Sequence, residues 1–95
     1  MIVRVRTIGL LKSLLQRGDL EVPLEDGGTV ADLLAAVAVL GGPQVAAHLE
    51  APVREAAHPP LRVMVNGRDI EVLGGRQTVL TDGDDVLVLT PIAGG

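Results

Sequence analysis

Residues 29–43 read TVADLLAAVAVLGGP, and this stretch decides the fold. Thr29 is a favourable helix N-cap, and Asp32 stands three residues later, in the position of a capping-box partner. The apolar residues recur at helical spacing and form one stripe, made of Val30, Leu33, Leu34, Val37 and Leu40. Gly41-Gly42-Pro43 then ends the helix, because glycine accepts the left-handed conformation and proline cannot continue the hydrogen bonding. The stretch predicts an amphipathic helix that packs its apolar stripe on another layer.

Two strands and a short helix are predicted before this main helix. Residues 2–7 alternate between apolar and polar side chains, which indicates a strand. Residues 10–15 hold leucines at helical spacing and suggest a short helix that breaks at Gly18-Asp19. Residues 20–24 alternate again, and Pro23 within them indicates an edge strand or a strand end, because proline has no N–H to donate to a ladder.

The segment after the main helix predicts short helical turns, a loop and two strands. Residues 44–50 suit one or two helical turns, whereas residues 51–60 contain three prolines and are interpreted as a loop. Residues 61–65 are expected to form a strand, and Asn66-Gly67 after them is a strong signal for a tight turn. Residues 70–73 are then expected to form a short strand.

Residues 86–89, which read VLVL, predict the central strand of the sheet. A continuously apolar run is expected of a strand that is buried on both faces, and here it would lie beside the first strand. The whole order suits an α+β fold of the β-grasp (ubiquitin-like) type, a mixed sheet of four to five strands with one main helix packed on it. A ferredoxin-like arrangement is the alternative, but it needs a second full helix where residues 51–60 look like a loop. We therefore expect a β-grasp domain over residues 1–91 and a flexible tail over residues 92–95.

The composition argues against several classes of function. The chain has 95 residues, enough for one domain, and 47% of them are hydrophobic, which argues against disorder. It has no Phe, Tyr or Trp that could stack on a nucleobase or flavin. The net charge is -4 without a basic patch, and the apolar stretches are far shorter than a membrane span, so neither nucleic acid nor a membrane is an expected partner. Because the chain has no Cys and no signal-like N-terminus, the expected location is the cytoplasm.

The side chains do not form a familiar catalytic or metal-binding motif. His48 and His58 stand ten residues apart without a partner at metal-ligand spacing. Ser13 is the only serine, and no nucleophile elbow surrounds it. The aspartates around Gly83, within residues 82–85, lack the spacing and the terminal Glu of a calcium loop and are interpreted as a solvated turn. We therefore expect neither a bound metal nor a bound cofactor.

The C-terminal residues PIAGG, at positions 91–95, remain as the candidate site. They follow the predicted central strand directly, and Pro91 would stiffen the exit. Two glycines also suit a mere chain end, but their lack of side chains lets a narrow segment thread a tight channel in a partner enzyme. ATP-dependent adenylation of the terminal carboxylate would give a mixed anhydride that a persulfide or thiol can attack. The product could be a C-terminal thiocarboxylate, for which the chain needs no Cys of its own.

Several segments resemble the MoaD/ThiS family. They are VNGRDI at residues 65–70, LGG at 73–75, LTDGDDV at 80–86 and PIAGG at 91–95. The likeness is specific over roughly residues 61–95, and DGGTV at residues 26–30 agrees with it upstream. Members of the family are β-grasp sulfur carriers, which include the small subunit of molybdopterin synthase and the CysO-type carrier of cysteine synthesis.

The resemblance implies a sulfur-carrier co-substrate rather than an enzyme. Gly95 would be adenylated by a ubiquitin-activating-type enzyme that uses ATP and Mg²⁺, and would then be thiocarboxylated with sulfur from a donor. Ile92, Ala93 and Gly94 would form the partner-binding tail. The sulfur-accepting synthase would be the large subunit of molybdopterin synthase or a cysteine-synthase-like enzyme. The family often has an aromatic residue near the last strand, and its lack here leaves the partner surface undefined.

Three questions stay open at this point. Arg68 and Arg76 could meet an acidic partner, although surface arginines are the simpler interpretation. The chain could instead be a protein modifier conjugated through Gly95, and its single lysine, Lys12, then argues against extensive lysine-linked self-chains. It could also be a β-grasp binding module that is never activated, in which case the tail would be dispensable.

Overall fold

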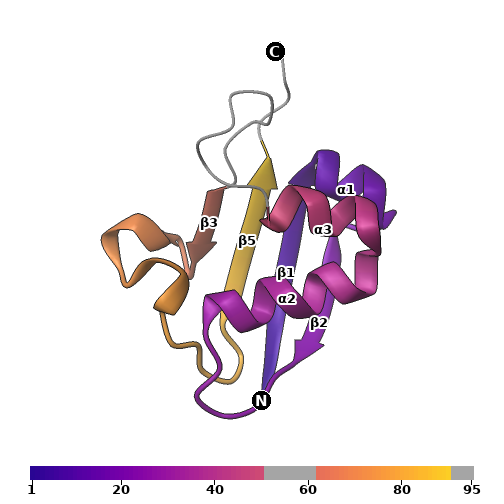
Figure 1. The fold of residues 1–95 in the computed structure, drawn as a ribbon. Coiled ribbons are helices and arrows are strands. Elements are labelled where there is room, and N and C mark those ends of the chain that lie inside the picture. Colours follow the sequence, from indigo (N-terminus) through magenta and orange to yellow (C-terminus); the bar gives the residue numbers. More distant parts are fainter. Residues whose placement is uncertain (51–61, 91–95) are drawn as a thin grey trace.

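Within residues 1–50 and 62–90, which the computed structural model describes, the chain forms a mixed five-stranded sheet in the order β2-β1-β5-β3-β4 (Figure 1). The central pair, β1 and β5, is parallel, and the other neighbours are antiparallel. The strands are β1 (Ile2–Gly9), β2 (Asp19–Pro23), β3 (Arg62–Val65), β4 (Arg68–Asp69) and β5 (Asp85–Thr90). The helices are α1 (Leu10–Leu15), α2 (Val30–Gly41), α3 (Pro43–Glu50) and the short 3-10 helices η1 (Ile70–Val72) and η2 (Gly75–Gln77). The predicted β-grasp fold is therefore confirmed.

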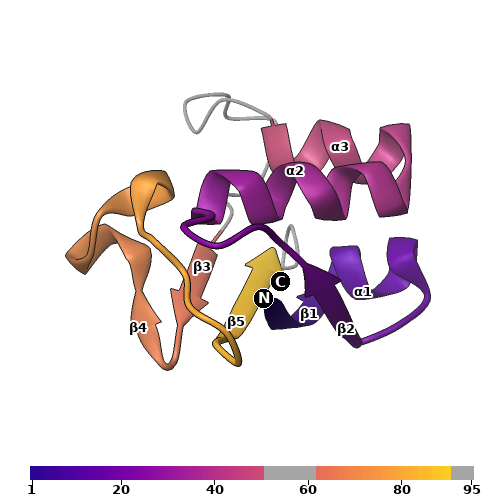
Figure 2. The ribbon, with the colours of Figure 1, turned by 90° about the horizontal axis from the view of Figure 1, so that it is seen from below.

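One face of the sheet is covered by α2 and α3, which form a layer above it in Figure 2. Between this layer and the sheet lies an aliphatic core, in which Thr7 is the one buried polar residue among those described. Its largest contributions to stability come from removing branched side chains from water, roughly 1.5–3 kcal/mol each. The fully buried side chains include Val3, Val5, Leu33, Val37, Val86 and Val88.

The main helix α2 begins as the sequence predicts. The backbone N–H of Asp32 donates to Thr29 Oγ1 at 3.4 Å, and the backbone N–H of Thr29 donates to Asp32 Oδ2 at 2.9 Å. This capping box is present in full. It satisfies two backbone donors that the first turn of a helix would leave unpaired.

The apolar stripe of α2 is right for four residues and wrong for Leu40. Leu40 is 62% exposed, whereas Ala38 is buried at 6% exposure. The stripe continues through Gly41, where an added Cβ would lie only 2.5 Å from Val45 Cβ. Gly42 adopts a φ of 82°, a left-handed value, and ends the helix there. The next helix, α3, packs its Val45 against Gly41. The buried face of α2 therefore includes Gly41 and not Leu40.

The edge strand and the tight turn are confirmed. β2, which contains Pro23, pairs with β1 alone and forms an edge of the sheet. Asn66 and Gly67 connect β3 to β4 with φ values of 52 and 85. Two successive positive φ values are typical of the type I′ hairpin turn, which Asn-Gly favours.

The short strand predicted at residues 70–73 is wrong. Ile70–Val72 form the 3-10 helix η1, and the strand that pairs with β3 across the hairpin is β4, Arg68–Asp69. The Asp69 side chain accepts a hydrogen bond at 2.9 Å from the backbone N–H of Glu71. A short acidic side chain that bonds the backbone two residues onward turns the chain, which ends the strand after two residues.

The central position of the last strand is confirmed, but its burial on both faces is not. β5 lies between β1 and β3. Val86 and Val88 are buried under the helices, whereas Leu87 and Leu89 on the opposite face are only half-buried. The helices of the described chain cover one face only, so the alternate leucines of β5 lie on an open surface.

Candidate functional site

The predicted functional tail follows the central strand of the sheet. The last residue of β5, Thr90, pairs with Gly9 at the end of β1. Hydrogen bonding to β1 on one side and β3 on the other holds β5 in place. The boundary at residue 91 and the site residues themselves lie outside the described residues and stay predictions: Ile92, Ala93, Gly94 and Gly95.

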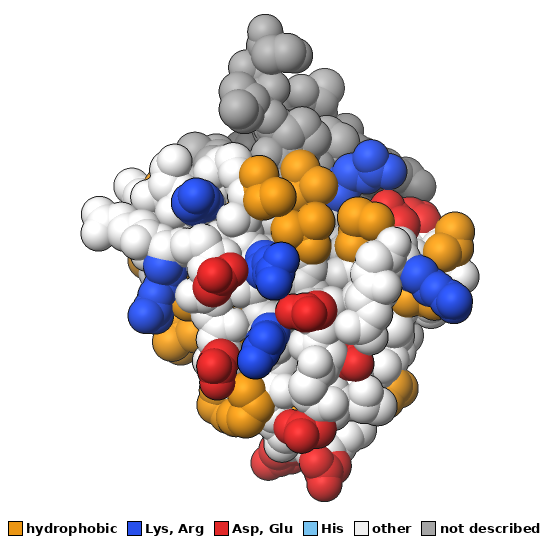
Figure 3. All heavy atoms as spheres, turned by 180° about the vertical axis from the view of Figure 1, so that it is seen from behind, with side chains coloured by type: hydrophobic (Ala, Val, Ile, Leu, Met, Phe, Trp, Pro, Cys, Tyr) orange, Lys and Arg blue, Asp and Glu red, His pale blue; other side chains and the backbone are white. Residues whose placement is uncertain are grey.

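Apolar side chains gather on the open face of the sheet near the end of β5 (Figure 3). Ile8 is 51% exposed and stands beside Leu89 in the parallel register of β1 and β5. Leu87 stands beside Met64 in the antiparallel register of β5 and β3, and both are half-buried. We call Ile8, Met64, Leu87 and Leu89 the apolar patch. Exposed apolar residues that are contiguous in this way are typical of a contact surface.

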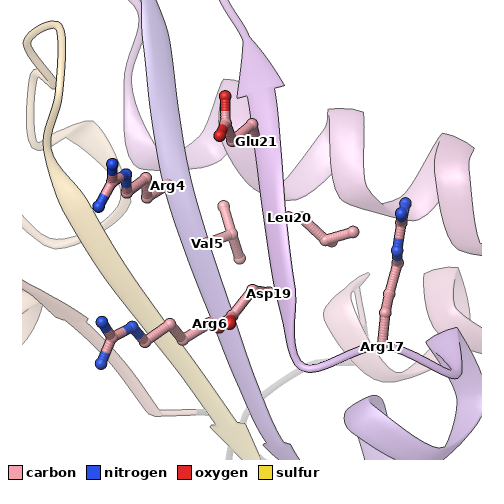
Figure 4. A pocket seen from close by; sticks show the side chains of 7 residues that line it. All are labelled: Arg4, Val5, Arg6, Arg17, Asp19, Leu20 and Glu21. Atoms are coloured by element: carbon pink, nitrogen blue, oxygen red, sulfur yellow. The ribbon is translucent and has the colours of Figure 1, made fainter.

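A charged groove lies on the same open face, further from the end of β5 (Figure 4). Its lining includes Arg4 and Arg6 from β1, which stand opposite Glu21 and Asp19 from β2. Within the described ranges neither arginine takes part in an ion pair. Both guanidinium groups are therefore available to an acidic partner. This pair was not predicted as a site from the sequence, although the alternation of residues 2–7 puts both arginines on the side away from the core.

The two arginines proposed from the sequence have different roles. Arg76 donates through Nη2 to the carbonyl oxygen of Leu49 at 3.1 Å, and this bond ties η2 to the end of α3. Arg68 lies exposed on β4. Arg76 therefore has a structural role, and only Arg68 of the two remains available to a partner.

The acidic turn at residues 82–85 is a structural feature. Asp82 accepts from the backbone N–H of Ile2 at 2.7 Å. Asp84 accepts from the backbone N–H of Thr81 at 2.8 Å and from Asn66 Nδ2 at 3.0 Å. Partial burial raises the pKa of Asp84, but the hydrogen bonds from Thr81 and Asn66 outweigh it and hold the pKa below the ordinary value of 3.8. These carboxylates fasten the turn to β1 and to the Asn66 hairpin.

The serine and the two histidines considered in the sequence are placed only in part. Ser13 is exposed on α1, His48 lies in α3, and His58 falls outside the described residues. Residues 1–50 and 62–90 hold no cluster of three His, Cys, Asp or Glu that suits a metal ion. The helices in these two ranges are all too short or too polar to cross a membrane.

Among the known proteins to which this chain is similar are one with a matching sequence segment and two with solved structures. Small archaeal modifier protein 3 from Haloferax volcanii is 49% identical over 37 residues, which are 39% of this chain and 40% of that protein. The crystal structure of SAMP1 from Haloferax volcanii covers 100% of both chains with a TM-score of 0.74 at 18% identity, which supports the fold. A chain of the Amycolatopsis orientalis BexX/CysO complex is 25% identical with a TM-score of 0.63, and the match covers 99% of that chain and 98% of this one.

A family model matches far more of the sequence. The model of the ThiS family matches residues 5–95, from the first strand to the last glycine. The match includes β1, the main helix, the central strand and the Gly94-Gly95 ending, and it confirms the resemblance found in the sequence. The chain therefore belongs to the ThiS family of small ubiquitin-like carrier proteins.

Proposed function

We propose that this chain is a sulfur carrier whose Gly95 carboxylate is adenylated and converted to a thiocarboxylate that donates sulfur in biosynthesis. The observation that carries the proposal is the match to the ThiS family over residues 5–95, which includes the terminal glycines. The position of β5 supports it. A tail that follows the central strand begins from a backbone that is hydrogen-bonded on both sides.

The proposed chemistry takes place on the main chain. The Gly95 carboxylate attacks the α-phosphate of ATP, pyrophosphate leaves, and an acyl adenylate forms. A persulfide sulfur then attacks the carbonyl carbon and AMP leaves, and a thiol cleaves the resulting sulfur–sulfur bond to release the thiocarboxylate. The chain has no Cys, so both the persulfide and the thiol must come from other molecules.

Three kinds of partner are required by this chemistry. They are an adenylating enzyme that uses ATP and Mg²⁺, a sulfur donor, and a synthase that accepts the sulfur. The synthase would be the large subunit of molybdopterin synthase or a cysteine-synthase-like enzyme. The likeness to a chain of the BexX/CysO complex supports a carrier that assembles with a partner protein. The expected site of action is the cytoplasm, where ATP is supplied.

The direct test is the intact mass of the chain after co-production with its adenylating enzyme and a sulfur source. We expect a species in which one oxygen has been exchanged for sulfur, and fragmentation should locate the exchange at Gly95. Incubation without ATP should leave the mass unchanged. An unmodified mass in every case, with an enzyme that activates another carrier normally, would contradict the proposal.

A protein modifier is the second candidate function. The observation that favours it is the 49% identity to small archaeal modifier protein 3 over 37 residues. Adenylation of Gly95 is common to both functions, and they differ in the nucleophile that follows. Recovery of isopeptide-linked conjugates in place of the thiocarboxylate would favour the modifier.

The apolar patch is expected to dock on the adenylating enzyme while the tail enters its active site. Ile8→Glu should weaken this docking by at least about tenfold, because burial of a branched aliphatic side chain contributes roughly 1.5–3 kcal/mol. The change should raise KM for the carrier and leave kcat unchanged, as measured by pyrophosphate exchange at varied carrier concentrations. Ile8 is 51% exposed, so the fold should persist.

Val39→Glu is the matched control for the patch. Val39 is 83% exposed on α2, in the helical layer on the other side of the sheet. The same apolar-to-acidic change there should leave KM unaltered. Equal effects of the two substitutions would show that net charge rather than the patch governs docking.

A further inference from the structure

The chain carries two amino groups, and the first of them, at Met1, is held by the fold. Met1 N donates to the carbonyl oxygen of Leu24 at 2.8 Å and lies 3.8 Å from Asp26 Oδ1. The Met1 side chain is 3% exposed. An amine in this position must break its hydrogen bond before it can attack another molecule.

The second amino group belongs to Lys12, the single lysine of the sequence. Lys12 is exposed in the last turn of the short helix α1. Its stem lies over Gly18: Cε is 3.4 Å and Nζ 3.9 Å from the point that a Cβ on Gly18 would occupy. In the described parts of the chain, its ammonium group forms no ion pair. The stem of Lys12 thus runs along the chain at Gly18, and the residue remains exposed.

Lys12 also lies at the end of the sheet where the tail begins. α1 follows β1 directly, and the last residue of β1, Gly9, pairs with Thr90 at the end of β5. Lys12 and Ile8 line one groove on the open face, so the amine stands beside the apolar patch.

We propose that Lys12 is a modification site, which accepts the activated glycyl C-terminus of a second copy of this chain. The inference rests on the proposed activation of Gly95. The unprotonated ε-amine attacks the Gly95 carbonyl carbon, and a C–N bond forms. The bond from that carbon to AMP, or to a thiol, breaks; AMP or the thiolate takes the electron pair, and the amine loses its proton to solvent. Since Lys12 is the only lysine, every lysine-linked pair has the same linkage.

The test uses a donor protein that has no lysine to be modified and an acceptor protein that has no Gly95 to be activated. The donor is the chain with Lys12→Arg and Gly95 prepared as a thioester, and the acceptor is the wild-type sequence without Gly95. We expect a linked pair, and trypsin should release residues 7–17 joined through Lys12 to residues 77–95. The thioester makes the adenylating enzyme unnecessary, so failure here would contradict the Lys12 site and leave the proposed adenylation standing.

Two controls separate a structural preference from chance reactivity. The first control is an acceptor that lacks Gly95 and also carries Lys12→Arg. Its yield of linked product should be at least nine-tenths lower, because the Met1 amine stays hydrogen-bonded to Leu24. In denaturing urea the Met1 amine is released, and linkage at Met1 should then appear. Equal yields from the two folded acceptors, linkage of the folded acceptor at Met1, or no linked pair with the Lys12 acceptor would each overturn the proposal.

Discussion

Replacement of Gly95 by Leu is expected to abolish activation and to leave the fold unchanged. An adenylating site that accepts a narrow main chain must bring the Gly95 carboxylate close to ATP, and glycine allows that approach because it has no side chain. The branched side chain of Leu would displace the carboxylate. We expect a loss of at least about a hundredfold in the rate of ATP–pyrophosphate exchange, which corresponds to roughly 3 kcal/mol in the transition state.

Thermal unfolding tests the second part of this prediction, that the fold is unchanged. Within residues 1–50 and 62–90 the core is already continuous from Val3 to Val88, so we expect a change at position 95 to leave the midpoint of unfolding unaltered. Deletion of Gly95 is the companion variant, which moves the carboxylate by one residue without adding bulk, and it should lose activation as well. Full activity in either variant would contradict the carrier proposal, and unfolding of the domain would mean that the tail is structural.

The second large effect is expected on stability, from Leu33→Ala. Leu33 is 0% exposed near the start of α2, and its side chain packs among aliphatic core residues. Truncation of a buried leucine costs roughly 2–5 kcal/mol, because contacts are lost and a cavity remains. A domain of this size has only about 5–15 kcal/mol of total stability. The loss should be measurable by urea denaturation as a lower midpoint at an unchanged slope.

Leu40→Ala is the control for this prediction. It makes the same chemical change on the same helix, but Leu40 is 62% exposed. Surface substitutions usually alter stability by no more than about 0.5 kcal/mol. The difference in the free energy of unfolding between the two variants measures the effect of burial, because the change in helix propensity is the same in both. Equal losses would mean that the helix packs with a different face from the one described.

Local signals in the sequence predicted most of the elements correctly. The capping box at Thr29 and the Asn66-Gly67 turn depend on side chains and backbone conformations within a few residues of each other. Pro23 predicted the edge strand for the same kind of reason, because a missing N–H excludes a residue from the middle of a ladder. Interactions of this range can be inferred from spacing without knowledge of the rest of the chain.

The errors fall where another contact overrides the apolar pattern of a segment. Leu40 continues the helical spacing, but α3 packs Val45 against Gly41 and turns the buried face toward Gly41. Residues 70–73 are rich enough in aliphatic residues to suggest a strand, but the Asp69 carboxylate turns the chain first. In neither case does the apolar pattern by itself contain the interaction that decides the outcome.

For the candidate site too, one part follows from residue types and another part follows from the packing of the chain. By itself the sequence supplied the proposed chemistry: a glycine ending, no cysteine and a family resemblance suggest the main-chain carboxylate of Gly95 as the reacting group, since these are properties of residue types. Only the tertiary structure decided which surface accompanies the tail. The leucines of β5 look like core in the sequence, and they form a patch because the described helices cover one face of the sheet. Which face is covered depends on the packing of segments far apart in the chain, and a one-dimensional pattern does not record it.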